Sequence, residues 1–232
     1  MGFNMSIYKP ALNSSFVIKD FFKLQKYRTS FSIEHPEYFP ADGLVVFCGG
    51  QGAGKTLSAV RYLDRLCKDF PSVIVVSNIG LHLSHEPAQI IPYTSLDDVR
   101  KMDNGYAGIV LLLDEIQILF NSLESKGIHP SVFQTISQQR KRRLHVIGTT
   151  QLFGRLAKPW REQCNVCVDC SALLGGSLQR NSVIDFGSIA EDINGNLTSY
   201  EYSYHSYWFR SPQLFDMYDT FEKVERRSNV SR

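Results

Sequence analysis

The stretch Gly49-Gly50-Gln51-Gly52-Ala53-Gly54-Lys55-Thr56 decides how this sequence is interpreted. It matches the pattern of a phosphate-binding loop, which requires a glycine, four free positions, and then glycine, lysine and serine or threonine. The glycines let successive backbone N–H groups turn inward and form an anion site at the start of a helix. In such a loop the lysine reaches the β- and γ-phosphates, and the threonine hydroxyl binds Mg²⁺. We therefore expect these eight residues to bind ATP, with Lys55 also catalytic and Thr56 a metal ligand.

The residues on either side of this loop support the same interpretation. Residues 44–48 form a short apolar run typical of a buried strand, and residues 57–68 repeat apolar side chains at helical spacing. The alternative is a glycine-rich turn that arose by chance, but such a turn does not require a strand before it and a helix after it. The strand–loop–helix order favours a nucleotide-binding loop.

An acidic motif follows the apolar run at residues 109–113, Ile-Val-Leu-Leu-Leu. A run without alternation is typical of a central parallel strand that is covered on both faces. The acids that end it, Asp114 and Glu115, would lie beside the phosphate loop. We expect Asp114 to hold Mg²⁺ and Glu115 to act as general base for the attacking water. The alternative is that the two acids only end a strand and begin the next helix.

A third strand is predicted over residues 145–151, His-Val-Ile-Gly-Thr-Thr-Gln, and it ends in polar residues. Ligands bind at the carboxyl ends of strands in open α/β sheets. Gln151 is therefore a candidate catalytic residue that contacts the γ-phosphate or the attacking water. Polar residues are common at strand ends, so the order of the three motifs carries more weight than Gln151 alone.

A basic cluster, Arg140-Lys141-Arg142-Arg143, ends a helix predicted over residues 130–143. Cations at a helix C-terminus can simply interact with its dipole and remain solvated. In a ring of identical subunits, Arg140 or Arg143 could instead reach the γ-phosphate bound by a neighbour, or contact DNA phosphates. No arginine of the subunit is clearly placed by the sequence to reach its own γ-phosphate, which favours a role in trans.

The remaining pattern predicts an α/β fold of the P-loop NTPase type. We expect a mostly parallel β-sheet with helices on both faces, followed by a C-terminal β-hairpin whose turn is Asn194-Gly195. Residues 1–40 form an N-terminal extension, residues 41–220 form the ATPase domain, and residues 221–232 form a basic tail that is expected to be mobile.

Composition is ordinary for a globular protein. The 232 residues are 43% hydrophobic and 21% charged, and the net charge of +2 does not require a nucleic-acid partner, although it permits a local basic surface. No apolar run approaches the roughly 18 to 20 residues that a membrane helix needs. No signal-peptide core is recognisable near the N-terminus, so the expected location is the cytoplasm.

Three of the five cysteines, Cys164, Cys167 and Cys170, repeat at a spacing that invites a metal or iron–sulfur interpretation. In a regular strand this spacing points Cys167 to the face opposite the other two. We therefore expect buried strand residues and no metal bound by these thiols.

Taken in order, these motifs resemble the FtsK–HerA group of P-loop motors, and within it the zonular-occludens-toxin-like and viral genome-packaging ATPases. Ser77-Asn78-Ile79 resembles a short element of the toxin-like proteins. Asp114-Glu115-Ile116-Gln117 resembles their acidic motif, and the segment at residues 214–220 resembles their closing Tyr-Asp segment. The similarity spans roughly residues 43 to 220.

This resemblance implies a ring-shaped homo-oligomer that hydrolyses ATP to move double-stranded DNA, with single-stranded DNA left open. Filamentous-phage assembly members of the group carry a membrane span, which this chain lacks. The implied function is therefore packaging of a viral genome into a preformed capsid, with capsid or portal-vertex proteins as partners. The protein would act in the cytoplasm of an infected cell or in association with the virion. A phage assembly and extrusion ATPase is the alternative.

Two other classes of function share part of the evidence. A small-molecule kinase would have the phosphate loop but would not need the Asp-Glu strand end or the arginine cluster. A non-enzymatic component of a virion would bind a nucleotide only for stability.

Overall fold

The computed structural model describes residues 18–41, 43–119, 143–156, 158–191 and 197–219. The chain divides into two compact units, Met1–Tyr38 and Phe39–Arg232. The predicted helix over residues 130–143, with Arg140, and the tail at 221–232 fall outside the described residues, apart from Arg143.

In the described part of the first unit, helix α2 spans Ile18–Glu34. Aromatic side chains near its end contact one another, with ring centroids 6.3 Å apart for Tyr27 and Phe31 and 5.0 Å apart for Phe31 and Tyr38.

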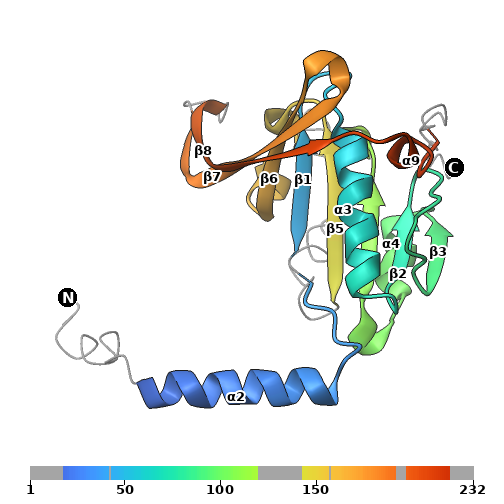
Figure 1. The fold of residues 1–232 in the computed structure, drawn as a ribbon, viewed down its shortest axis with the longest axis vertical. Coiled ribbons are helices and arrows are strands. Elements are labelled where there is room, and N and C mark those ends of the chain that lie inside the picture. The colour runs from blue at the N-terminus through green and yellow to red at the C-terminus, as the bar shows by residue number, and fades with distance from the viewer. Residues whose placement is uncertain (1–17, 42, 120–142, 157, 192–196, 220–232) are drawn as a thin grey trace, which may run out of the picture. The chain divides into compact units, whose positions relative to one another are not determined.

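The second unit is built on one sheet of eight strands in the order β3-β2-β4-β5-β1-β6-β7-β8 (Figure 1). The strands are β1 (Leu44–Cys48), β2 (Ile74–Ser77), β3 (Gln89–Pro92), β4 (Ile109–Leu113), β5 (Leu144–Thr150), β6 (Cys164–Leu173), β7 (Leu178–Glu191) and β8 (Leu197–Phe209). Neighbours from β3 to β6 pair in parallel, whereas β6, β7 and β8 pair antiparallel. The predicted fold class is confirmed.

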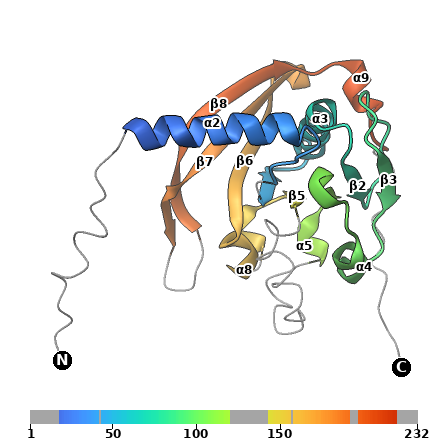
Figure 2. The same cartoon turned by 90° about the horizontal axis from the view of Figure 1, so that it is seen from below.

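Helices cover both faces of the parallel strands, as continuous apolar strands require. Helix α3, Lys55–Asp69, packs its buried apolar residues on one face. The other face is covered by α4 (Leu96–Lys101), α5 (Ile116–Leu119), α8 (Lys158–Arg161) and a 3-10 turn at Phe153–Arg155. Seen along the strands, α3 lies on one side of the sheet and α5 and α8 lie on the other (Figure 2).

The register of the parallel strands brings the ends of β1, β4 and β5 to the same edge of the sheet. Val46 pairs with Gly148 and Cys48 pairs with Thr150, so β1 and β5 end side by side. Leu113 of β4 pairs with Gly148, which brings the end of β4 to the same edge. The phosphate loop, the acids after β4 and the polar end of β5 therefore meet, as predicted.

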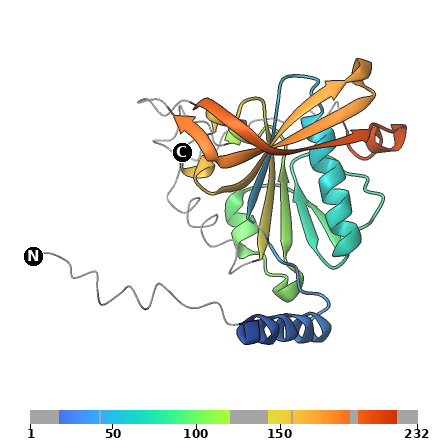
Figure 3. The ribbon, with the colours of Figure 1, turned by 60° about the vertical axis from the view of Figure 1, so that its left-hand side comes forward.

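The antiparallel strands β7 and β8 form the predicted hairpin and extend beyond the parallel strands (Figure 3). The turn at Asn194-Gly195 lies outside the described residues. Strand β7 begins at Leu178, and a 3-10 turn, Leu174–Gly176, connects it to β6. After β8 a short helix, α9 (Pro212–Phe215), follows.

The cysteine prediction is partly wrong. Cys167 and Cys170 are buried on opposite faces of the sheet, as expected, but Cys164 packs on the same face as Cys167. The reason is an irregularity in β6: Leu44 pairs with Cys164 whereas Val45 pairs with Val166, so one residue bulges out and the alternation shifts. Within the described ranges, no three His, Cys, Asp or Glu side chains gather as metal ligands.

Candidate nucleotide-binding site

The phosphate loop connects β1 to α3 and depends on glycine at both ends. Gly49 has a φ of 144°, and a Cβ on it would lie 2.6 Å from the Cys170 carbonyl oxygen. Gly54 has a φ of 86°, and a Cβ on it would collide with the side chains of Gln179 and Arg210. Left-handed backbone and close contact both exclude larger residues. The glycines of the motif are therefore required by the fold around the loop as well as by the ligand.

Lys55 is the first residue of α3, and its side chain is 7% exposed. Its Nζ atom donates to the carbonyl oxygen of Gly50 at 3.2 Å, across the loop. This folds the ammonium group over the backbone N–H groups at the helix start, where anions are favoured. The arrangement provides one buried positive charge at the start of α3.

Asp114 receives hydrogen bonds from two sides. The hydroxyl groups of Thr56 and Thr149 both donate to its Oδ1 atom at 2.7 Å. Its backbone is fixed by Asn78, whose amide accepts from the Asp114 N–H at 2.7 Å and donates to the Asp114 carbonyl at 2.9 Å. Thr56 and Asp114 are the oxygen ligands that Mg²⁺ prefers, and they are already adjacent. When bound, the ion would neutralise phosphate charge.

Glu115 has an unusual backbone. Its φ is 52°, a left-handed conformation that costs a residue other than glycine on the order of 1–3 kcal/mol. Its N–H donates to Thr149 Oγ1 at 2.9 Å, and its carboxylate accepts a hydrogen bond from the Gln117 amide. The strained turn directly follows Asp114, so Glu115 lies next in sequence to the candidate metal ligand, where a general base for water is expected.

Two residues to which the sequence assigned no role complete this edge. Thr149 joins Asp114 to Glu115 through its hydroxyl, and Asn78 holds the Asp114 backbone. Gln151, which was singled out, lies at the start of the loop: its carbonyl accepts from the Gly49 N–H at 3.3 Å, and the residue is exposed. Its proposed contact with phosphate or water stays a prediction.

Arg143 lies at the opposite end of β5. Arg143 directly precedes Leu144, the first residue of β5. The phosphate loop follows Cys48, which pairs with Thr150 at the other end of β5. The length of this seven-residue strand, about 20 Å, therefore separates Arg143 from the loop. Its guanidinium lies 4.6 Å from the ring centroid of Tyr106, and its carbonyl accepts from the Ile109 N–H. Arg143 therefore cannot act on the nucleotide of its own subunit, and a role in trans stays a prediction.

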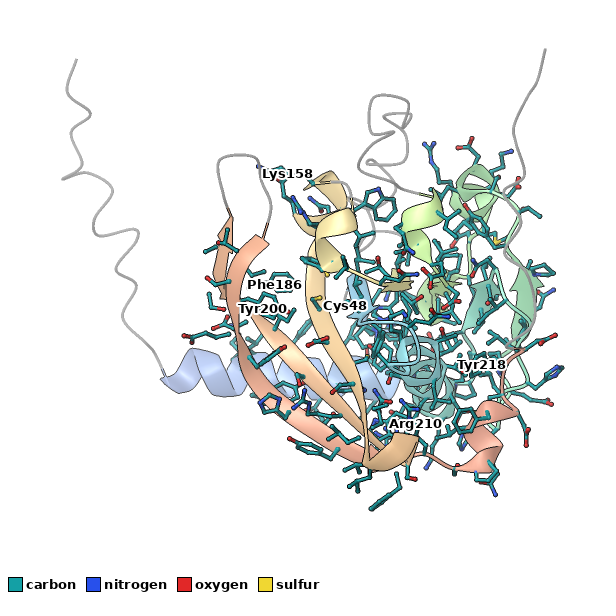
Figure 4. The ribbon with its side chains drawn as sticks, turned by 90° about the horizontal axis from the view of Figure 1, so that it is seen from above. Cys48, Lys158, Phe186, Tyr200, Arg210 and Tyr218 are labelled. Carbon is teal, nitrogen blue, oxygen red and sulfur yellow. The ribbon has the colours of Figure 1, made fainter. Side chains whose placement is uncertain are left out.

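Arg210, which belongs to none of the sequence motifs, lies against the phosphate loop of its own subunit. It follows β8, and its guanidinium donates to the Ala53 carbonyl at 3.2 Å and to Gln179 Oε1 at 2.6 Å. Gln179 is fully buried and donates to the same carbonyl at 3.0 Å. Figure 4 shows Arg210 beside the end of α3. No sequence spacing connects residues 126 or more positions apart, so no motif could have revealed this contact.

Tyr218, in the segment after α9, lies near both Asp114 and Arg210. It is 9% exposed and pairs with Leu81 in an isolated β-bridge. Burial raises the pKa of its hydroxyl, the nearby Asp114 charge raises it further, and Arg210 partly opposes this. The closing Tyr-Asp segment thus packs against the core through Met217 and Tyr218.

The parallel sheet, the phosphate loop after β1 and the acid after β4 define the class: this is a P-loop nucleoside-triphosphatase fold. The model of the family described as zonular occludens toxin (Zot) matches residues 43–222. The chain belongs to the zonular occludens toxin family.

Among solved structures, the N-terminal domain of zonular occludens toxin from Neisseria meningitidis is similar, with a TM-score of 0.52 and 14% identity over 76% of this chain and 98% of that one. The genome packaging NTPase B204 from Sulfolobus turreted icosahedral virus 2, in complex with ATP-gammaS, has a TM-score of 0.47 and 14% identity over 69% of this chain and 97% of that one. At these identities the first likeness concerns the fold alone. A comparison with curated protein sequences found no match.

No helix in the described ranges combines the length and the apolar character needed to cross a bilayer.

Proposed function

We propose that the protein hydrolyses ATP at the phosphate loop. The observation that carries this proposal is the 2.7 Å hydrogen bond from Thr56 to Asp114, which joins the loop to the acid of a different strand. A structural turn would not need this pairing, because Thr56 and Asp114 are 58 residues apart and come together only at the edge where a metal–nucleotide complex binds.

The residues then divide the work by position. Lys55 would leave its contact with Gly50 and reach the β- and γ-phosphates. Glu115, beside the metal ligands, would accept a proton from the attacking water. Thr149 would hold both acidic residues in place, because its hydroxyl bonds the Asp114 carboxylate and the Glu115 N–H together.

We further propose that hydrolysis drives the movement of DNA by a ring of identical subunits. The position of Arg143 supports this: it lies far from its own loop, so it can serve catalysis only at another subunit. Packaging of a viral genome into a preformed capsid, with capsid or portal-vertex proteins as partners, is the first candidate process. It would take place in the cytoplasm of an infected cell or at the virion.

Phage assembly and extrusion is the second candidate, and one observation favours it. The family whose model matches most of this chain is that of the zonular occludens toxin-like proteins. Both candidates require the same ATPase core and the same nucleotide-dependent action on a polymer.

ATPase assays with double-stranded DNA, with single-stranded DNA and without DNA test the proposal, on protein whose oligomeric state is measured by light scattering. We expect hydrolysis that DNA stimulates and that a Lys55→Ala variant lacks. The type of DNA that stimulates more identifies the polymer. Phosphate transfer to a nucleoside without DNA stimulation would instead indicate a kinase, and ATP binding without turnover would indicate a structural component.

A further inference from the structure

The carbonyl group of Ala53, within the phosphate loop, accepts two hydrogen bonds from outside the loop. The Gln179 amide donates to it at 3.0 Å, and the Arg210 guanidinium donates to it at 3.2 Å. Gln179 lies in β7 and Arg210 directly follows β8, so both donors belong to the antiparallel hairpin and neither belongs to the nucleotide-binding motif. A carbonyl that is held by two directional bonds can turn very little. The hairpin therefore fixes the orientation of this part of the loop.

The two donors are themselves held in place. Gln179 is buried, and its Oε1 atom accepts from Arg210 Nη2 at 2.6 Å and from Arg210 Nε at 3.0 Å. The backbone joins them a second time: the Arg210 N–H donates to the Ser177 carbonyl at 2.9 Å, and Gln179 pairs with Trp208 across the hairpin. The two side chains and the base of the hairpin therefore form one unit.

The same unit extends to the first turn of α3. Gln179 Nε2 donates to Asn181 Oδ1 at 3.0 Å, and the buried Ser58 hydroxyl donates to the same oxygen at 3.1 Å. The Gln179 amide thus directs its nitrogen to the acceptors of Ala53 and Asn181 and its oxygen to the Arg210 donors. A flipped amide would bring oxygen against oxygen, so these partners permit only one orientation.

The direction of the Ala53 carbonyl decides where the Gly54 N–H points. The two groups belong to one planar trans peptide unit, in which the C=O and N–H bonds point in opposite directions. Because the carbonyl faces the hairpin, the Gly54 N–H faces away from it. In phosphate-binding loops, backbone N–H groups of this kind hold the phosphates.

We propose that Gln179 and Arg210 are positioning residues that aim the Gly54 N–H at the phosphate groups of the nucleotide. They act through the Ala53–Gly54 peptide and not by contact with the ligand. Glycine at position 54 permits this, since a Cβ there would collide with both side chains. The inference rests on the proposed function, because it concerns the same phosphate loop.

Calorimetry of the full chain with ATP, ADP and inorganic tripolyphosphate tests the proposal. Gln179→Met keeps the approximate size of the side chain and the charge of the site, but it cannot donate to Ala53. We expect the dissociation constants of all three ligands to rise about tenfold, because a hydrogen bond to a charged phosphate is weakened. Arg210→Gln should also weaken all three. Arg180→Gln is the matched control: this arginine neighbours Gln179 on β7 but donates to Ser171, and its loss should leave binding unchanged.

The Gly54 N–H can also be observed directly. Alanine precedes glycine at only two places in the sequence, Ala53-Gly54 and Ala107-Gly108. Carbonyl-¹³C alanine combined with ¹⁵N-glycine therefore selects these two amide groups in an NMR spectrum. Saturating tripolyphosphate should move the Gly54 proton of wild type downfield, as donation to an anion does. Gly108 precedes β4, at the end of the strand away from Asp114, and should not move.

In Gln179→Met the downfield shift of Gly54 at saturation should be much smaller than in wild type. A role of Gln179 in stability alone would lower the unfolding temperature and leave this shift unchanged. The wild-type measurement needs no substitution: a Gly54 signal that does not respond to bound tripolyphosphate overturns the proposal by itself.

The two proposals fail in different ways. If wild type binds neither ATP nor tripolyphosphate, the phosphate-loop function itself is wrong, and the positioning is wrong as well. If wild type binds both but Gln179→Met binds them equally well, only the positioning is wrong. A loss confined to Arg210→Gln has the same meaning, because the removed charge alone would explain weaker binding of anions. Weaker binding in both variants, with a smaller Gly54 shift, supports the positioning.

Discussion

The Thr56 hydroxyl donates to Asp114 Oδ1 at 2.7 Å, which joins the first turn of α3 to the end of β4. The same Asp114 oxygen accepts from Thr149. One carboxylate atom therefore fixes three elements of the sheet edge relative to one another. An ion that replaces these hydrogen bonds would find its oxygen ligands already adjacent.

We predict that Asp114→Asn separates nucleotide binding from the effect of Mg²⁺. An amide keeps the size of the side chain but loses the charge that the ion needs. Calorimetry should show ATP bound with similar affinity in the presence and absence of Mg²⁺, whereas Mg²⁺ should strengthen binding to wild type. A variant that still responds to Mg²⁺ would place the metal ligand elsewhere.

Lys55→Ala should abolish measurable ATP binding. The substitution removes a buried positive charge that lies over the loop, and no other cation of the motif replaces it. Lys68→Ala, at the far end of the same helix, is a matched control and should bind ATP as wild type does. Retained affinity in Lys55→Ala would mean that the loop does not bind phosphate.

Glu115→Gln should keep ATP bound while hydrolysis slows by about 10²-fold or more, the scale expected for the loss of a general base. The variant keeps the hydrogen bond to Thr149, because the backbone N–H of residue 115 donates it and the side chain takes no part. Single-turnover assays measure the chemical step directly. Near-normal turnover would assign water activation to another residue.

Mixing two inactive variants tests the ring. Arg143→Ala should bind ATP but lose hydrolysis, since the length of β5, about 20 Å, separates Arg143 from its own loop and the residue can act only on a neighbour. Mixed with Glu115→Gln, it should recover part of the activity, because one type of interface then combines an intact Glu115 with an intact Arg143. The control is each variant alone at the same total concentration. An Arg143→Ala variant with normal turnover, in protein that remains monomeric, would contradict the ring; Arg140→Ala should be tested in parallel.

Stability should fall in mild acid because of His145. This residue is 1% exposed and burial lowers its pKa to about 4, whereas an unfolded histidine titrates near 6.5. As the pH falls, the unfolded chain therefore binds the proton before the folded chain does. The contribution of neutral His145 to the free energy of unfolding is complete above about pH 6.5, and up to about 3 kcal/mol of it is lost as the pH falls toward 4. Urea unfolding across this range should give a shallower pH dependence for His145→Phe. His82→Gln, which changes an exposed histidine, should retain the wild-type dependence.

The parts of the site that the sequence predicted are those written in consecutive residues. The loop and the Asp114-Glu115 pair each follow a strand, and parallel strands bring such ends together.

The parts that were missed depend on packing between distant segments. Arg210 meets Ala53 only because the hairpin folds back over the loop, 157 residues away. Cys164 lies on the face of the sheet opposite the predicted one, because a bulge shifts the alternation of β6. Strand alternation alone cannot indicate where a bulge falls. Strand β3, four mostly exposed residues with a proline, lacks the apolar run that marked the other parallel strands.

Because the cysteines are buried, the native chain should react only slowly with alkylating reagents. The five thiols are free, four of them are buried, and burial raises the pKa of Cys67, Cys164, Cys167 and Cys170, so little thiolate is present at neutral pH. Cys48 and Cys167, with sulfur atoms 3.6 Å apart, lie directly under the phosphate loop. The rate at which maleimide modifies these two thiols would report how often the sheet opens locally and exposes them. A single cysteine added at the surface would, in turn, carry a fluorophore or spin label without any native thiol having to be removed.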